Sequence, residues 1–399
     1  FGVKFSLLLN LKHWIDRRFM AKYQRLTMPP TPAPIPFPGL ISKSGSQLND
    51  PAFAAMRCLG CAAKTGHKVL ETALENATNI ARSEGADTVF LPDPGITTDA
   101  ADMEGPPPGH HLVQSVDIIS EIISDPFLLG RVAALHALSD LYAVMAQPTS
   151  ALAIINLPEA SLSIQTNQLT QILAGALIVL SEAGVTLSGG HTSEGNTLSV
   201  GFSVTGFAKN KKSTAANAKD TVLVLTKPLG TGVIMAANMQ LIAEANWVEA
   251  AISQMVISNQ TAAQIFAKMN VVTATDITGF GLARHALNLS IRAGAKGCVL
   301  NLTSLPLLPG TIELIKSGVR SSLHEQNREA VVIDQSRLTK NTVFGAHLET
   351  LFDPQTSGGL LGLSRRKDAK SLLKQLKDNG HDAAIIGHLD FNNSSVQLI

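Results

Sequence analysis

The sequence predicts two domains that each mix helices and strands, and three observations support this prediction. The chain has 399 residues, which is enough for two or three domains with separate cores. Hydrophobic residues make up 45% of it, as in a well-packed globular protein. From about residue 50 onward, stretches with helical spacing of apolar residues alternate with short stretches typical of strands.

Two segments precede the first predicted domain. Residues 1–28 have the pattern of an amphipathic helix with basic residues, and residues 29–49 are expected to form a linker. The stretch MPPTPAPIPFPGL holds six prolines, each of which fixes φ and removes a backbone donor, so an extended conformation is expected.

The first predicted domain covers residues 50–209. Apolar residues at helical spacing predict helices over residues 69–81, 126–146 and 166–184. Gly184 is expected to end the last of them. Apolar or alternating runs predict strands over residues 111–117, 150–158 and 197–208, with Asp117 at the end of the first.

The polar segment NKKSTAANAKD, residues 210–220, breaks this pattern and marks a domain boundary. The second predicted domain covers residues 217–399. Its strands are expected at TVLVLT, KGCVLNL, GGLLGLS and DAAIIGHL, with helices between them.

Charge and cysteine content exclude several classes of function. Lys and Arg number 32 against 31 Asp and Glu, and only 18 residues are aromatic, so neither a nucleic acid nor an anionic membrane is an expected partner. No apolar run reaches the roughly 18 residues that a membrane span needs. Three cysteines cannot build a disulfide framework, which favours a reducing, cytoplasmic location.

Four aspartates lie in contexts that suggest chemistry: Asp99, Asp117, Asp140 and Asp276. Singly, each is also compatible with a cap, a turn former or a solvated residue. Asp140 has apolar neighbours on a predicted helix, where a carboxylate is costly to bury without a cation or donors. Several carboxylates without an all-protein cage are typical of a Mg²⁺–nucleotide site, since Mg²⁺ keeps waters and shares phosphate oxygens.

Four glycine-containing segments, LSGGHT, KPLGTG, TGFG and QTSGGLL, are interpreted as turns next to strands or helices. Glycine lets backbone amides approach phosphate oxygens closely. None of the four is a Walker A loop or a dinucleotide fingerprint. Together with the aspartates they suggest phosphate handling, although plain turn formation explains each one alone.

The segment RCLGCAAKTG contains Cys58, Cys61 and Lys64. A structural zinc site would need a second ligand pair, and the remaining cysteine, Cys298, is isolated in a predicted buried strand. A redox dithiol, a thiolate beside an ammonium group, and two small buried cysteines at a turn all fit the spacing. Lys64 is also suited to neutralising phosphate oxygens.

Seven segments in order resemble those of selenophosphate synthetase (selenide, water dikinase): GCAAK, TDAAD, HALSDLYA, SGGHTSEG, LTKPLGTG, TDITGFGLARH and LFDPQTSGGLL. The resemblance extends over nearly all of residues 56–399. HTSEG and RSSLHEQN resemble the branch of that family in which this module follows a flavin-dependent pyridine-nucleotide oxidoreductase. KHWIDRRFMAKY similarly looks like the tail of that oxidoreductase, so residues 1–28 are expected to belong to an upstream module.

The resemblance implies an α+β fold of the aminoimidazole ribonucleotide synthetase type, with two domains of mixed sheets flanked by helices, and a homodimer. It implies ATP-dependent synthesis of selenophosphate from selenide and water, with AMP and orthophosphate released and Mg²⁺ required. It also implies roles for residues. Cys61 and Lys64 match the catalytic positions. Asp99, Asp140 and Asp276 match the metal ligands, and Lys64, Asp117, Asp140, Gly189, Gly190 and His191 match nucleotide-contacting positions.

Two departures from the family pattern bear on this site. Thr97-Thr98 stands where arginine and aspartate are frequent, and His136 stands where asparagine is common. Two alternative functions also fit the fold: a kinase of another small molecule, and a nucleotide-binding regulator of a fused oxidoreductase. The intact set of charged residues favours the active dikinase over both.

Overall fold

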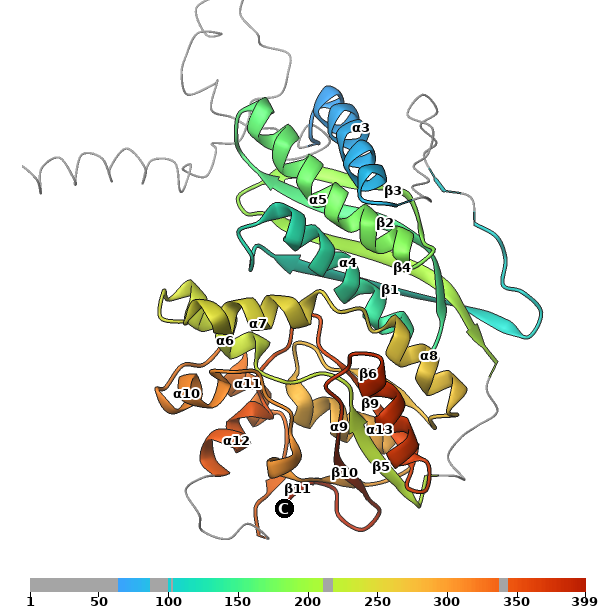
Figure 1. Ribbon diagram of the computed structural model, residues 1–399, viewed down its shortest axis with the longest axis vertical. Coiled ribbons are helices and arrows are strands. Elements are labelled where there is room, and N and C mark those ends of the chain that lie inside the picture. The colour runs from blue at the N-terminus through green and yellow to red at the C-terminus, as the bar shows by residue number, and fades with distance from the viewer. Residues whose placement is uncertain (1–63, 87–99, 102, 211–217, 337–343) are drawn as a thin grey trace, which may run out of the picture. The chain divides into compact units, whose positions relative to one another are not determined.

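A computed structural model describes residues 64–86, 100–101, 103–210, 218–336 and 344–399 (Figure 1). The predicted tail, the linker, Cys58, Cys61, Thr97-Thr98 and Asp99 lie outside these residues. Within them the chain forms two sheets flanked by helices, which confirms the predicted α+β class. The division at residues 210–220 stays a prediction, and the first sheet ends at Lys209 while the second begins at Thr221.

The first sheet has the strand order β1-β4-β2-β3 in the described residues. Its strands are β1 (His110–Ser120), β2 (Gln147–Pro158), β3 (Thr186–Gly195) and β4 (Ser199–Lys209). Strands β1 and β2 run antiparallel to β4, and β3 runs parallel to β2. Helices α4 (Pro126–Ala143) and α5 (Leu162–Glu182) contact this sheet, and α3 (His67–Ser83) packs on α5.

Helix α4 contacts both sheets. Asp125 caps its first turn by accepting the amide of Leu128 at 3.0 Å, and Pro126 occupies the first helical position, where no amide donor is needed. Most of its side chains are buried, because α4 contacts strands β1, β2 and β4 of the first sheet and β6 and β9 of the second. It therefore carries side chains to both sheets.

The second sheet has the order β6-β9-β5-β10-β7-β11-β8 in the described residues. Its strands are β5 (Thr221–Leu225), β6 (Ala274–Asp276), β7 (Gly297–Leu300), β8 (Ile333–Asp334), β9 (Leu360–Arg365), β10 (Ala384–Asp390) and β11 (Val396–Leu398). Every residue of β5 is buried, which explains its continuous apolar run.

Helices cover both faces of the second sheet. Val222 and Val224 share a core with helices α8 and α13, while Leu223 and Leu225 share another with α9. The helices here are α6 (Thr231–Met239), α7 (Ala245–Met255), α8 (Gln260–Lys268), α9 (Gly281–Arg292), α10 (Thr311–Lys316), α11 (His324–Glu329), α12 (Phe344–Thr350) and α13 (Ala369–Asp378), with a 3-10 turn at Leu302–Ser304.

Most predicted elements are confirmed, and two boundaries and one predicted turn are corrected. Helix α5 begins at Leu162, four residues before the predicted start. Strand β1 continues to Ser120, so Asp117 lies inside it and not at its end. The predicted turn at Gly189-Gly190 is wrong, because both glycines belong to strand β3.

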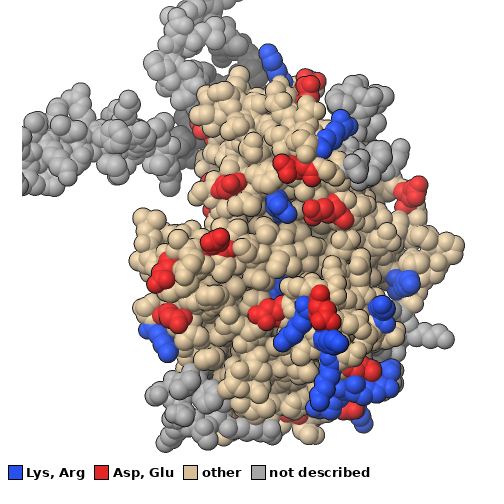
Figure 2. Space-filling model, in the orientation of Figure 1, with Lys and Arg blue, Asp and Glu red and all other residues tan. Residues whose placement is uncertain are grey.

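The mixed surface charge and the character of the helices agree with what the composition predicts. Figure 2 shows acidic and basic side chains on the same face, with basic ones most densely at the lower right and acidic ones among them. None of the helices in the described part of the chain combines the length and apolar character that crossing a bilayer requires.

Candidate active site

Three of the predicted aspartates come together between the two sheets. Asp117 lies on β1, Asp140 on α4, and Asp276 at the end of β6. A hydrogen bond links Asp117 to Asp140, and Ser115 Oγ donates to Asp140 Oδ2. The charges of Asp117 and Asp140 both act on Asp276, so the three carboxyls form one electrostatic group.

The cluster formed by these three carboxyls is arranged to receive positive charge. Burial, followed by the charge of Asp140, raises the pKa of Asp276 to about 7, and the same causes raise the pKa of Asp117 to about 7. The buried Oδ2 of Asp276 finds no hydrogen-bond partner in the described part of the chain. A cation would relieve both the repulsion and the unsatisfied oxygen, so these residues fit Mg²⁺.

The cluster is nevertheless not a complete protein cage. No three His, Cys, Asp or Glu side chains among the described residues are arranged so that they alone hold a metal ion. Asp99, the third predicted ligand, lies outside the described residues. A cation here would therefore need water or phosphate oxygens as further ligands, which is the usual behaviour of Mg²⁺ at nucleotide sites.

Lys64 lies at the other edge of the first sheet. It forms an isolated antiparallel bridge with Ser193 of β3, and the amide of the next residue donates to the Thr192 carbonyl at 3.1 Å. Lys64 is exposed. The predicted glycines and His191 lie on this same strand, so Lys64 and the SGGHTSEG segment form a second group.

The width of the first sheet separates the three aspartates from Lys64 and the SGGHTSEG segment. Asp117, Phe202, Ala153 and Gly190 form one register row across its four strands. Three strand spacings of about 4.8 Å place Gly190 roughly 14 Å from Asp117. Within one chain, the structure therefore brings Asp117, Asp140 and Asp276 together but does not bring Lys64 or Gly190 to them.

Gly190 shows why this strand needs glycine. Its φ is +156°, and a Cβ atom there would lie 2.2 Å from the carbonyl oxygen of Ala153. The β2–β3 pairing shifts register between Ala151 and Leu152, opposite Ser188 and directly before the glycine pair. The glycines thus accommodate a close, irregular strand pairing, which the sequence pattern of a turn did not reveal.

Another glycine segment, KPLGTG, is not available to phosphate. Gln355 Oε1 accepts the amides of Gly230 and Thr231 at 3.0 and 3.2 Å, at the start of α6. Asp353 is buried beside them, and burial raises its pKa to about 6. The sequence did not reveal that Gln355 accepts these amides, since it lies over 120 residues from the KPLGTG segment.

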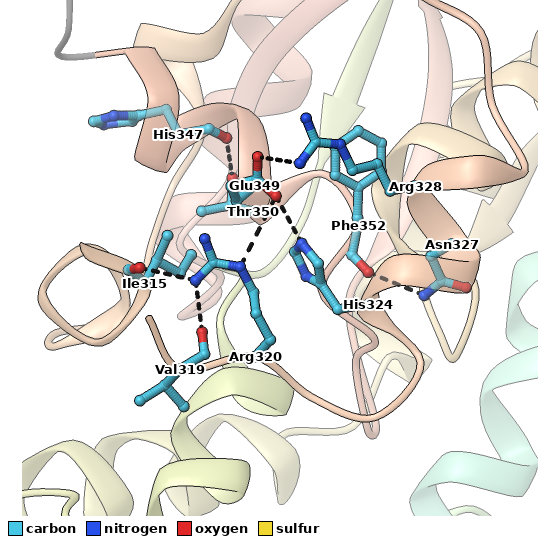
Figure 3. A network of polar contacts seen from close by, with 10 residues as sticks. All are labelled: Ile315, Val319, Arg320, His324, Asn327, Arg328, His347, Glu349, Thr350 and Phe352. Carbon is cyan, nitrogen blue, oxygen red and sulfur yellow. Dashed lines mark hydrogen bonds and ion pairs between the residues drawn. The ribbon is translucent and has the colours of Figure 1, made fainter. Parts of the chain in front are cut away.

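The RSSLHEQN segment belongs to an ion-pair network centred on Glu349 of α12 (Figure 3). The carboxylate of Glu349 contacts His324 Nε2 at 2.7 Å, Arg328 Nη1 at 3.0 Å and Arg320 Nε at 3.9 Å. The hydrogen bond from His324 is the main cause that lowers the pKa of Glu349. The network fixes α11 to α12.

Asn327, on the same helix α11, ties this network to the loop that follows Asp276. Its Nδ2 donates to the Gly279 carbonyl at 2.8 Å and to the Phe352 carbonyl at 3.0 Å (Figure 3 shows the second contact). On the other side of the loop, His285 Nε2 accepts the Thr278 amide at 3.2 Å. The TGFG segment is thereby held from two helices.

Of the three cysteines, the structure describes Cys298. It is fully buried in β7, and burial raises the pKa of its thiol to about 12, so it is not a nucleophile in the folded protein. Cys58 and Cys61 lie outside the described residues, and the predicted role of Cys61 stays a prediction.

Comparison with known proteins first defines the general class. Residues 97–208 match the family described as AIR synthase related protein, N-terminal domain, and residues 218–396 match its C-terminal domain. Among solved structures, thiamine-monophosphate kinase from Stenotrophomonas maltophilia covers 80% of this chain and 94% of its own, with a TM-score of 0.60 and 17% identity. Hydrogenase maturation protein HypE in complex with ATP gives a TM-score of 0.57 at 16% identity, covering 76% and 82%. These structures share the fold.

Curated relatives define the family. A selenide, water dikinase of Geobacter sp. strain M21 is 36% identical over 345 residues, covering 84% of this chain and 94% of the relative. One from Clostridioides difficile is 31% identical over 337 residues, covering 82% and 92%. The chain therefore belongs to the selenide, water dikinase family.

Proposed function

We propose that this chain synthesises selenophosphate from selenide, ATP and water, releasing AMP and orthophosphate. Its similarity to selenide, water dikinases over nearly their whole length supports the proposal. The structural observation that carries it is the convergence of Asp117, Asp140 and Asp276 on one buried, electrostatically strained group.

In this proposal Asp140 and Asp276 hold Mg²⁺ together with Asp99, and Asp117 contacts the nucleotide. When bound, Mg²⁺ neutralises charge that develops on phosphoryl oxygens. The carboxylates of this chain would orient the cation, and water or phosphate oxygens would complete its ligand set. Lys64 adds a positive charge against the phosphates, and Cys61 acts as a thiolate that delivers or protects selenide.

We propose further that the active form is a homodimer, because a single chain keeps its charged groups at opposite edges of one sheet. Leu112, Val116 and Ile118 of β1 are more than half exposed and line the sheet face that α4 and α5 leave uncovered. Strands β1 and β3 form the two edges of this sheet in the described residues, and Lys64 and Thr65 pair with β3 at Thr192 and Ser193. A two-fold arrangement that sets β1 beside β3 of a second copy would bring Asp117 near Lys64 and Gly190 of that copy.

The activity is tested by measuring AMP release from purified protein with Mg²⁺, ATP and selenide. Cys61→Ser, Lys64→Ala and Asp276→Asn are each expected to lower turnover about a hundredfold or more, as loss of a preorganised charge or nucleophile does. Asp220→Asn is the matched control, since Asp220 is exposed and forms an ion pair with Arg366 at 3.1 Å, away from the three aspartates. Its turnover should equal that of the wild type.

Three outcomes would contradict the proposal. No AMP release, beside an active dikinase control, would remove the activity, and ADP as the product would indicate a kinase of another small molecule. Unchanged turnover in both Cys61→Ser and Lys64→Ala would show that the site is assigned wrongly. The upstream oxidoreductase module and the cytoplasmic location remain predictions, tested by sequencing the flanking gene region and by cell fractionation.

A further inference from the structure

The TSGG loop, residues 356–359, lies between helix α4 and strand β6, which carry Asp140 and Asp276. Ser357 in this loop has a φ of +48°, a left-handed conformation that is unfavourable for any residue but glycine, and it is buried. A buried residue keeps such a conformation only when its surroundings fix it. The contacts of Ser357 identify what does so.

Three partners fix Ser357. Its amide donates to His136 Nδ1 of α4 at 3.0 Å, its carbonyl accepts from Lys227 Nζ at 3.0 Å, and its Oγ donates to the Met255 carbonyl at 2.7 Å. Because a backbone amide can only donate, Nδ1 of His136 must be unprotonated. Burial lowers the pKa of His136, which keeps that nitrogen available as an acceptor.

The next residues join the loop to both carboxylate-bearing elements. Asn259 Nδ2 donates to the Gly358 carbonyl at 2.8 Å and to Ser139 Oγ of α4 at 2.9 Å. Ser139 hydrogen-bonds Asp276, which lowers the pKa of that carboxyl against the effect of burial. The amide of Ile277, directly after Asp276, donates to the Gly359 carbonyl at 2.9 Å.

Backbone atoms pack closely against both glycines of the loop. A Cβ atom on Gly358 would lie 2.1 Å from the Ile277 carbonyl oxygen, and one on Gly359 would lie 2.6 Å from the Lys227 amide nitrogen. One side of the loop is therefore fixed to the residue after Asp276. The other side is fixed to α4 at His136, one helical turn before Asp140.

We propose that His136 is a positioning residue, which holds α4 against the TSGG loop by accepting the Ser357 amide and so sets the position of Asp140 relative to Asp276. The proposal rests on the proposed metal site at these two carboxylates. His136 touches neither the nucleotide nor the cation in this role. The alternative is that His136 only fills space in the core.

The chemistry of the acceptor separates these two roles. Asparagine Oδ1 stands close to where histidine Nδ1 stands and also accepts a hydrogen bond, whereas leucine fills similar space and accepts none. His136→Asn should therefore keep the positioning. His136→Leu leaves the Ser357 amide buried and unpaired, so the loop and α4 must separate to admit water.

The test measures binding of Mn²⁺ alone to the full chain by electron paramagnetic resonance, with thermal melting in parallel. We expect His136→Leu to weaken Mn²⁺ binding about tenfold and His136→Asn to bind within about twofold of the wild type. Val396→Ala is the control, because it makes a cavity in β11, in the core on the far side of the second sheet. It should lower the melting temperature and leave Mn²⁺ affinity unchanged.

The outcomes separate failure of this inference from failure of the metal site. If Asp276→Asn binds Mn²⁺ as the wild type does, the metal site itself is wrong. If Asp276→Asn loses binding but His136→Leu retains it, or if His136→Asn is as weak as His136→Leu, His136 does not position the site. Should His136→Leu fail to fold, His136→Met replaces it. His136→Met likewise removes the acceptor of the Ser357 amide, and unchanged Mn²⁺ affinity in that variant would overturn the proposal.

Discussion

At the scale of single residues, the buried Asp276 carboxyl makes the stability of the protein depend on pH. It is only 4% exposed, and burial together with the charge of Asp140 raises its pKa from 3.8 to about 7. Between these two pH values the folded protein binds more protons at Asp276 than the unfolded chain does. Stability contributed by the protonated form is therefore lost as the pH rises.

We predict that the metal-free protein loses stability between about pH 4 and pH 7. The slope due to Asp276 is at most about 1.4 kcal/mol per pH unit. Urea unfolding at a series of pH values in a chelating buffer measures it. Asp276→Asn should flatten the profile, and Mg²⁺ added to the wild type at pH 8 should raise stability by mass action. A wild-type profile as flat as that of Asp276→Asn would contradict the raised pKa.

The sequence allowed part of this residue-level description. Asp117, Asp140 and Asp276 were identified from their small or apolar neighbours and from the family resemblance, and the structure brings them together. The contact between His136 and Ser357 joins positions 221 residues apart. No periodicity reports such a pair, because it is set by the way α4 meets the second sheet.

At the scale of elements, the crossing of α4 and α5 depends on close backbone approach. A Cβ atom on Gly130 of α4 would lie 2.0 Å from the Ile172 carbonyl oxygen of α5. Alanine within a helix usually stabilises by about 0.5–1 kcal/mol relative to glycine. At this crossing the steric overlap exceeds that gain.

We predict that Gly130→Ala destabilises the protein by about 1–3 kcal/mol, the usual cost of overpacking. Gly345→Ala in α12 is the control, because nothing lies within 4 Å of the added Cβ atom there. It should be neutral or slightly stabilising. Denaturant midpoints measure both variants, and equal effects would show that the helices can separate without cost.

The link between α11 and α12 gives a second element-scale prediction. His324, followed by Arg328, lowers the pKa of Glu349 below its ordinary value of 4.5. The stability that Glu349 contributes is present above that pH and is lost as the pH falls through the lowered pKa. Loss of the negative charge also weakens the hydrogen bond and ion pairs that Glu349 makes with the buried His324 and with Arg328.

We predict that Glu349→Gln lowers stability at pH 7 by about 1–3 kcal/mol and weakens the loss of stability below pH 4.5. Glu325→Gln, an exposed change on α11, is the control and should stay within about 0.5 kcal/mol of the wild type. Thermal melting at pH 7 and pH 4 measures both. Identical acid profiles for Glu349→Gln and the wild type would remove Glu349 as the cause.

Secondary structure was predictable where one physical requirement dominated. The helical spacing of α3 reports burial of one side, and the alternating apolar residues Val200, Phe202 and Val204 of β4 lie in the core as expected, although the other face of β4 is also largely covered. Strand β3 was not predicted, since its glycine pair resembles a turn. Its conformation is set by the backbone of Ala153 on the neighbouring strand, which no local pattern encodes.

At the scale of the whole molecule, the separation of Lys64 from Asp276 gives a test of the proposed homodimer. If each site takes Lys64 from one subunit and Asp276 from the other, a mixed dimer of Lys64→Ala and Asp276→Asn chains contains one intact site. Random mixing makes half of all dimers mixed, so roughly a quarter of wild-type activity should return. If each site belongs to one chain, mixing restores nothing.

We predict recovery of AMP release when the two inactive variants are unfolded and refolded together. The same treatment of each variant alone is the control, and light scattering measures the oligomeric state. A monomer, or no recovery in a mixture that contains mixed dimers, would contradict the shared site.

The burial of Cys298 has a practical consequence for work on the native chain. Cys298 contributes no reactive thiol to the folded protein, so any cysteine labelled there must be Cys58 or Cys61. A fluorophore or spin probe can thus be directed to the four-residue stretch from Cys58 to Cys61 without removing any other cysteine. Appearance of a third labelled thiol would report the opening of the second sheet.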